Sequence, residues 1–305
     1  MGQSLVQKLR AWLAMARPPF HTVGLLPFVL GCVLARQQTG RFRWDVALWG
    51  VAGVVLVMLA TYLAGEYWDF AEDSLSAGRS RFAGGSQVVQ RGQLPRQAPL
   101  WGSIVSLALA LGVGLVLQAG YHTGTCTIPL GVIGILGGFF YSTRPLRWVS
   151  TGLGELWIAL CYGWLPVAVG YYLQTGRIAS TVHWPAISIG LSIFNVILIN
   201  EYPDWAADSL AGKRNLAVRL GRERAAWLYA LATAGGWAGV LLSLHHGAPA
   251  SMLLFYVPAW IACSIAVIGV LTGRWRDPSV LERLCAATLL ANLATSGAFI
   301  LAFWP

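Results

Sequence analysis

The chain has 305 residues, of which 56% are hydrophobic and only 11% are charged, and its mean hydropathy is +0.61. An ordinary soluble domain carries about 25% charged residues, so this composition argues against a soluble enzyme. The net charge of +9 is spread over the loops between apolar runs, which argues against a nucleic-acid partner. The five cysteines stand singly, and we interpret them as small core residues.

The apolar runs predict an all-α polytopic membrane protein. Residues 1–19 place Leu5, Leu9 and Leu13 at helical spacing among basic residues, which indicates a helix in the membrane interface. A cleaved signal peptide is the alternative, but the apolar run that follows has the length of a full span. About 20 apolar residues cross a bilayer as a helix. We expect about nine spans, at residues 20–36, 45–64, 99–119, 126–141, 153–173, 184–200, 224–243, 252–272 and 284–303.

The basic residues predict the orientation in the membrane. With a cytoplasmic N-terminus, all of the 21 Lys and Arg fall on the cytoplasmic side except Arg36, Arg41, Arg43 and Arg177. This bias follows the positive-inside rule and predicts an integral protein of the cell (inner) membrane, in contact with its lipid. The odd number of spans then places the C-terminus outside.

The acidic residues are concentrated in two loops. More than half of the 12 Asp and Glu lie in the segments 66–73, after the second predicted span, and 201–208, after the sixth. Both segments read E-Y-x-D-F/W-A-x-D, about 135 residues apart. We expect a single membrane-embedded domain over residues 1–305, built from two pseudo-repeated parts that each carry one acidic motif.

The spacing of the acids predicts a metal site. Acids at i, i+3 and i+7 lie on one face of a helix, where their charges repel one another unless a cation neutralises them. Oxygen ligands without His or Cys favour Mg²⁺, which also binds substrate phosphates. Basic residues follow each motif and are suited to bind a phosphate or a departing diphosphate. The candidate metal ligands are Glu66, Asp69, Asp73, Glu201, Asp204 and Asp208, and the adjacent bases are Arg79, Arg81, Lys213 and Arg214.

These motifs resemble those of the UbiA superfamily of intramembrane prenyltransferases. The family's N-D-x-x-D-x-x-x-D motif appears as Gly65-Glu66-x-x-Asp69-x-x-x-Asp73, and its D-x-x-x-D motif as Asp204-x-x-x-Asp208. Gly65 and Glu66 depart from the pattern, so the carboxylate at position 66 lies one methylene further from the backbone than the family's aspartate. The resemblance implies a helical bundle around a central cavity, with a cytoplasmic cap, two Mg²⁺ ions that bridge a diphosphate, and a lateral opening for a lipid chain.

Three further segments are similar to the 1,4-dihydroxy-2-naphthoate polyprenyltransferase branch of the family. They are A-R-P-P-F-H-T-V near Arg17, F-Y-S-T-R-P-L-R followed by G-L-G-E at residues 152–155, and the run from Asn200 to Gly221. The resemblance implies Mg²⁺-dependent transfer of a polyprenyl group from polyprenyl diphosphate to an aromatic acceptor. The expected acceptor is 1,4-dihydroxy-2-naphthoate, in menaquinone-type quinone biosynthesis.

The candidate site residues fall into two further groups. The expected catalytic residues are Lys213, Arg79, Tyr141 and Glu155, the last being an acid within a predicted span. The expected substrate-binding residues are Arg17, His21, Tyr67, Arg81, Arg144, Arg147, Asn200 and Arg214. Pairing of Glu155 with Arg144 or Arg147, and an interfacial role for His21, are the alternatives.

Three other functions are compatible with parts of the pattern. A related enzyme would use another acceptor, such as a hydroxybenzoate, a glycerol-phosphate lipid or chlorophyllide. A cation-coupled carrier would also have repeats and acids, but carriers usually place their acids near the bilayer midplane. A partner-binding scaffold gives no reason for two matched carboxylate clusters.

Overall fold

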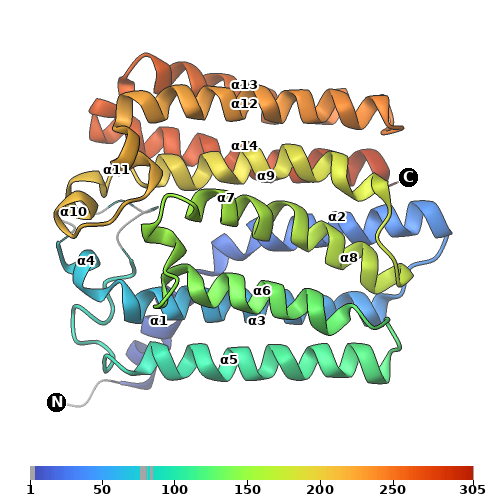
Figure 1. Cartoon of the computed structure of the whole chain (residues 1–305), viewed down its shortest axis with the longest axis horizontal. Helices are drawn as coiled ribbons and strands as arrows, with labels where there is room; N and C mark the ends of the chain where they lie inside the picture. Colours follow the sequence, from blue (N-terminus) through green and yellow to red (C-terminus); the bar gives the residue numbers. More distant parts are fainter. Residues whose placement is uncertain (1–3, 76–79, 81, 83–84, 305) are drawn as a thin grey trace.

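The computed structural model describes residues 4–75, 80, 82 and 85–304, and the regular elements within them are all helical. Long helices run side by side along the bundle (Figure 1). These are α2 (Thr22–Thr39), α3 (Trp44–Trp68), α5 (Ala98–Leu115), α6 (Thr127–Ser142), α8 (Leu165–Thr175), α9 (His183–Asn200), α12 (Arg222–His245), α13 (Met252–Leu271) and α14 (Pro278–Phe303).

Shorter helices lie before and between the long ones. They are α1 (Leu5–Ala16), α4 (Phe70–Leu75), α7 (Gly154–Ile158), α10 (Trp205–Leu210) and α11 (Leu216–Leu220). Wide π-helical turns extend α5 through Val116–Gly120 and join α7 to α8 through Ala159–Trp164. Such turns interrupt a helix without ending it, so residues 154–175 form one span.

The prediction of a polytopic helical membrane protein is confirmed. Eight helices in the described residues are long and apolar enough to cross a membrane. The fourth predicted run, 126–141, is the one outside these eight; it lies in α6, which has 16 residues and is therefore about 24 Å long, slightly less than a hydrocarbon core of about 30 Å. Each predicted apolar run thus lies on a helix or on consecutive helical segments and extends at most one residue beyond them.

The helix ends follow local chemistry. Ser4 caps α1 by accepting a hydrogen bond from the Gln7 N–H, and Asp277 caps α14 by accepting from Ser279 and Val280. The first helix ends where Arg17 adopts a left-handed conformation (φ 48°), directly before Pro18. The chain then turns into α2, so Arg17 lies at the junction of α1 and α2.

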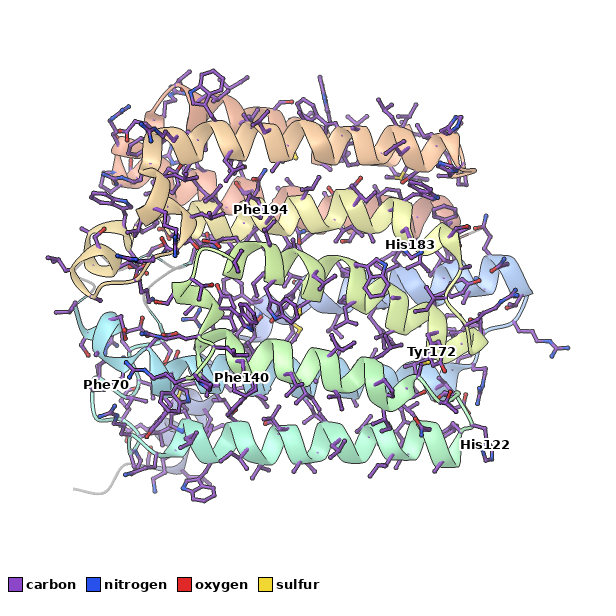
Figure 2. The ribbon with its side chains drawn as sticks, in the orientation of Figure 1. Phe70, His122, Phe140, Tyr172, His183 and Phe194 are labelled. Atoms are coloured by element: carbon purple, nitrogen blue, oxygen red, sulfur yellow. The ribbon has the colours of Figure 1, made fainter. Side chains whose placement is uncertain are left out.

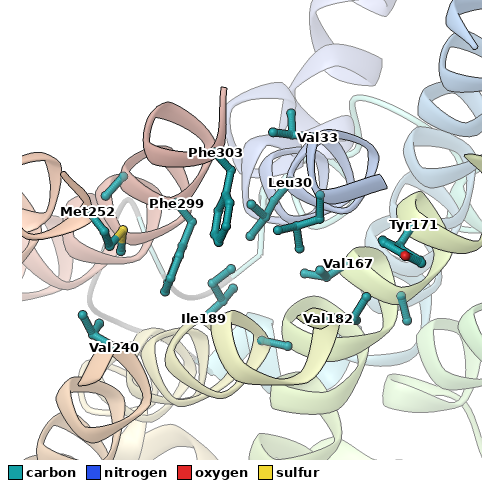
Figure 3. Close-up of a cluster of buried hydrophobic side chains, with 14 of the residues drawn as sticks. Leu30, Val33, Val167, Tyr171, Val182, Ile189, Val240, Met252, Phe299 and Phe303 are labelled. Atoms are coloured by element: carbon teal, nitrogen blue, oxygen red, sulfur yellow. The ribbon is translucent and has the colours of Figure 1, made fainter. Parts of the chain in front are cut away.

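The core holds α2, α8, α9 and α14 together at the centre of the bundle. Phe299 and Phe303 of α14 lie against Ile189 of α9 and the α2 side chains (Figure 3). Between α2 and α8 the backbones touch, because a Cβ on Gly31 or on Gly170 would collide with a backbone carbonyl of the other helix. Small residues of this kind let membrane helices approach closely.

The two acidic motifs lie at one end of the bundle. The short helices α4, α10 and α11 gather there, whereas the C-terminus lies at the opposite end (Figure 1). Figure 2 places Phe70 at the α4 end and His122 at the other. Helix α4 packs against α10, so the two motifs approach each other.

Candidate active site

A cavity of about 250 Å³ lies between the two acidic motifs. It is lined by side chains from α3, α4, α9 and α10 and from the loop before α11. All six candidate metal ligands line it, together with two cations, Arg17 and Lys213, and with Tyr141 and Asn200. The structure therefore brings residues about 135 positions apart into one cavity.

Each motif is broken rather than carried on one continuous helix, and that part of the expectation is wrong. Helix α3 ends at Trp68, and Asp69 leaves helical geometry before α4 begins. Helix α9 ends at Asn200, and a turn containing Pro203 precedes α10. Proline lacks an N–H and disfavours a continuing helix, which explains the second break. The six acids line the cavity in spite of these breaks.

The first motif is held by the loop at residues 85–87. Glu66 accepts hydrogen bonds from the Ser86 N–H and from Ser86 Oγ, both at 2.7 Å, and Arg17 Nη2 lies 3.8 Å from its Oε1. Gly85 adopts φ +61° and packs so closely on the Asp73 carboxylate that a Cβ there would collide with it. Glycine at this position thus permits a close approach of the backbone to Asp73.

Arg147 joins the first motif to the loop after α6. Its Nη2 donates to Asp69 Oδ1 at 3.1 Å and also to Glu72 Oε1, while Ser142 Oγ donates to Asp69 Oδ2 at 2.7 Å. Burial by itself raises the pKa of Glu72, but the ion pair with Arg147 outweighs it and lowers that pKa. Arg147 therefore orients Asp69, and it does not line the cavity.

The second motif contains an internal cation. Lys213 Nζ lies 3.1 Å from Asp208 Oδ1, and Asn215 Nδ2 donates to Asp208 Oδ2 at 2.9 Å. Burial alone would lower the pKa of Lys213, but the charges of Asp69 and Asp208 raise it, so its ammonium group stays protonated. An ammonium group held between two acidic motifs neutralises part of their repulsion.

Asp73 of the first motif has a strongly raised pKa. Burial and the charge of Asp69 raise its pKa to about 8. A carboxyl group with this pKa is mostly neutral at pH 7, and a bound cation would favour its ionised form.

The residues present fit Mg²⁺ with a phosphate ligand. Among the described residues, no three acidic, His or Cys side chains converge into a metal site of their own. Mg²⁺ binds proteins through one or two carboxylates and keeps waters or substrate phosphates in its other positions. Two pairs of carboxylates, Asp69 with Asp73 and Asp204 with Asp208, meet this requirement around the cavity.

Several predicted site residues lie elsewhere. Arg79 and Arg81 are outside the described residues. His21 packs edge-on against Tyr62, and the Tyr67 ring lies under the Arg96 guanidinium, so neither lines the cavity. Arg144 and Arg214 are exposed and also do not line it. Glu155 is buried beneath α11, where its Oε1 accepts a hydrogen bond from the Leu216 N–H, and it pairs with neither arginine among the ion pairs of the described chain.

Sequence reasoning missed three residues that position the acids. Ser86, Ser142 and Asn215 donate hydrogen bonds to Glu66, Asp69 and Asp208 respectively. Asn215 carried a signal, because an asparagine directly before an apolar helical run is a common N-cap. The two serines carried none, since each lies far from its acid in the sequence.

A second cavity, of about 130 Å³, continues from the first into the bundle. Thr61 and Tyr162 line both cavities and mark the junction. The second cavity is mainly apolar and is lined by α3, α5, α6 and α8. Along α6 its wall includes Gly131, Gly134 and Gly138, which the i, i+3, i+7 spacing places on one face.

Comparison with known proteins identifies the family. The family model described as "UbiA prenyltransferase family" matches residues 24–299. The chain belongs to the UbiA prenyltransferase family. As a member of it, the protein is a membrane-embedded transferase of prenyl groups.

Relatives of this UbiA protein support the assignment over most of the chain. The 1,4-dihydroxy-2-naphthoate octaprenyltransferase of Escherichia coli is 27% identical to this chain, and the alignment covers 100% of this chain and 99% of the relative. The protein of the same name from Bacillus subtilis is 30% identical, and the alignment covers 84% of this chain and 78% of the relative. The fold matches that of a UbiA homolog from Archaeoglobus fulgidus bound to GPP and Mg²⁺, with a TM-score of 0.66, 16% identity and coverage of 95% and 99% of the two chains.

Proposed function

We propose that this protein transfers a polyprenyl group from polyprenyl diphosphate to 1,4-dihydroxy-2-naphthoate, a step of menaquinone-type quinone biosynthesis. The observation that carries the proposal is the pair of joined cavities: one lined by carboxylates and Lys213, the other apolar. A prenyl diphosphate has the same two parts, an anionic head and a hydrocarbon tail. The names of the relatives supply the acceptor.

Two Mg²⁺ ions fit the two carboxylate pairs, with Asp69 and Asp73 holding one and Asp204 and Asp208 the other. When bound, the ions would neutralise the diphosphate and act as Lewis acids toward the leaving group. Glu66 and Glu201 line the same cavity, but each already accepts backbone hydrogen bonds, from Ser86 and Ala217. A backbone amide is fixed in place, whereas the side chains that contact Asp69 and Asp208 can rotate away when a metal binds, so we assign these two glutamates to the support of the motifs.

Lys213 and Arg17 provide the protein's own positive charge at the cavity. As the allylic C–O bond breaks, its electron pair leaves with the diphosphate, and fixed cations lower the energy of that charge. The acceptor carbon then bonds to the allylic carbon and loses its proton. Tyr141 and Tyr162 line the cavity near the junction, where aromatic faces can stabilise an allylic cation and apolar walls limit access of water.

The apolar cavity provides the space for the prenyl chain. It extends along α3 from Thr61 to Gly50, which is about 16 Å of helix. Gly131 leaves open space where another residue would place a side chain, and a Cβ on Gly134 would only reach ordinary contact with Leu165. A hydrocarbon tail gains free energy by leaving water for such a cavity or for the adjoining lipid.

The charge distribution supports an orientation with the acidic cavity on the cytoplasmic side of the cell (inner) membrane. The N-terminus would then be cytoplasmic and the C-terminus outside. The protein's partners would be a polyprenyl diphosphate, the aromatic acceptor and membrane lipid, without nucleic acid. The matching motifs, followed in each half by a short helix at the same end, support a single domain of two related parts.

The proposal is tested with the purified protein in detergent or liposomes. We expect geranylgeranyl diphosphate and 1,4-dihydroxy-2-naphthoate to give a prenylated product only when Mg²⁺ is present; mass spectrometry detects it and distinguishes the prenylated naphthoate from the naphthoquinol formed when its carboxyl group leaves as CO₂. Diphosphate release with hydroxybenzoate but not with the naphthoate would contradict the assignment of 1,4-dihydroxy-2-naphthoate as the acceptor. Ion flux through liposomes without diphosphate release, at several chain lengths, would favour a carrier.

A further inference from the structure

Two glutamates lie close together at the acidic cavity: Glu201 is partly exposed and lines it, and Glu155 is buried beside Glu201. Glu155 lies at the start of α7 and is 1% exposed, whereas Glu201 directly follows α9. Burial and the neighbouring Glu155 charge raise the pKa of Glu201 well above its usual range. Glu155 does not line the cavity among the described residues, so contact with a substrate there does not explain its position.

Both carboxyl groups hold the first turn of α11. The Leu216 N–H donates to Glu155 Oε1 at 2.6 Å, and the Ala217 N–H donates to Glu201 Oε2 at 3.2 Å. The next amide, that of Val218, donates to Asn215 Oδ1 at 2.9 Å. The first amides of a helix have no acceptor within the helix, so these three bonds fix where α11 begins. A helix of five residues has little stability of its own and depends on such contacts.

The start of α11 in turn fixes the cavity side of the loop. Asn215, the residue that caps α11, also donates its Nδ2 to Asp208 Oδ2. Lys213 lies two residues earlier, donates its backbone N–H to Asp208 O at 2.9 Å and places Nζ on Asp208 Oδ1. A shift of α11 would therefore move Lys213 and Asn215 relative to Asp208.

We propose that Glu155 and Glu201 are positioning residues, which hold the start of α11 and through it set Lys213 and Asp208 for diphosphate binding. Glu155 thereby connects the span from α7 to α8 with the loop that follows α9. The proposal rests on the proposed function for its kinetic readout. It replaces the two roles predicted from the sequence, which were direct catalysis by Glu155 and metal ligation by Glu201. Both glutamates act through the backbone of residues 216 and 217.

The test compares E155Q with E155A. Glutamine keeps an oxygen for the Leu216 N–H and offers an N–H to Glu201, whereas alanine removes both. We expect E155A to lower kcat/KM for the prenyl diphosphate by at least about tenfold, as for loss of a buried hydrogen bond, with the KM for the acceptor unchanged. E155Q should restore most of the activity. The control E223A removes an exposed glutamate, 68% accessible in its ion pair with Arg276, and should leave the kinetics unchanged.

A backbone variant tests the same bond from its other side. Leu216 is the first residue of α11, where proline is well tolerated, and Asn215 has the extended conformation (φ −64°, ψ 170°) that precedes proline. L216P removes the N–H that donates to Glu155. The L216A variant keeps this N–H and controls for the loss of the leucine side chain. We expect L216P to reproduce the kinetic loss of E155A, and the double variant L216P/E155A to lose little more than either alone.

Hydrogen exchange supplies a readout that does not depend on activity. The amides of residues 216–218 should exchange faster in E155A than in wild type and at the wild-type rate in E155Q. If E155Q is as inactive as E155A while its exchange stays slow, Glu155 acts chemically and the proposal is overturned. Unchanged exchange in E155A would also overturn it. A wild-type protein without prenyl transfer would contradict the proposed function, and the exchange measurement would still decide whether the pair holds α11.

Discussion

At the scale of single residues, Lys213 and Arg214 are adjacent cations with opposite environments. Lys213 is 9% exposed and contacts Asp208 in the cavity, whereas Arg214 points to solvent. We predict that K213M lowers kcat about 100-fold, the effect of removing one group that stabilises a developing negative charge. Steady-state rates of diphosphate release measure this loss. R214M is the matched control and should retain nearly full activity. Equal losses of activity in the two variants would contradict a specific role for Lys213 in the site.

Protonation of Asp73 makes a prediction about pH. Its pKa of about 8 means that Mg²⁺ must displace a proton below that pH, because the metal binds the ionised form. The apparent affinity for Mg²⁺ should therefore rise from pH 6.5 to pH 8 and level off above it. Titration calorimetry in buffers of different ionisation heat would detect the released proton. The D73N variant should lose this proton release, and a wild-type affinity that falls with rising pH would contradict the assignment.

Some of these residues could be predicted from the sequence, and others could not. The spacing of the acids sufficed to predict Asp69, Asp73, Asp204 and Asp208 at the cavity, because both motifs leave the membrane on the same side. Neighbours in sequence were less informative. Tyr67 follows Glu66 but faces Arg96, since successive residues of a helix point in different directions. The direction of a side chain depends on packing that one sequence does not reveal.

At the scale of elements, α6 presents its glycines to the apolar cavity in a graded series. Gly138 lies near the junction with the acidic cavity, and Gly134 and Gly131 lie progressively deeper. A leucine at Gly131 would meet no atom within 4 Å at its Cβ, so it should fill the cavity without disturbing the backbone. We predict that G131L shortens the longest prenyl diphosphate that is used efficiently, and that G134L shortens it further.

Competition between prenyl diphosphates of different length, with products separated by mass, measures this change. The matched control is G112L, because Gly112 is exposed on α5, also has open space at its Cβ and does not line the cavity. An identical chain-length profile in wild type, G131L and G134L would show that the prenyl chain lies elsewhere.

The elements themselves were the most predictable part of the structure. Hydropathy predicted each long helix, since a span must satisfy its backbone hydrogen bonds internally and cover them with apolar side chains. The short helices α4, α10 and α11 were not predicted as separate elements. Their ends depend on distant side chains, as the contact of Glu155 with Leu216 shows, 61 residues apart in the sequence.

At the scale of the whole molecule, four crossings separate the first acidic motif from the second, so both emerge on the same side. The structure places α4 and α10 at one end of the bundle and the loop that contains His122 at the other (Figures 1 and 2). We predict that exposed Cys126, in that distant loop, reacts with a membrane-impermeant maleimide added outside intact cells. A C126S/S74C variant, with its cysteine beside the acidic motif, should react only after the membrane is opened. The reverse pattern would place the acidic cavity outside.

The central claim is that one substrate occupies both cavities, with its diphosphate between the acidic motifs and its chain along α6. The most direct measurement is a structure of the protein with Mg²⁺ and a non-reactive thiodiphosphate analogue of geranylgeranyl diphosphate. The account predicts phosphate oxygens within hydrogen-bonding distance of Lys213 Nζ, metal density beside Asp69 and Asp204, and the chain passing Gly138 toward Gly131. A diphosphate bound away from Lys213, or a chain that leaves the apolar cavity empty, would contradict it.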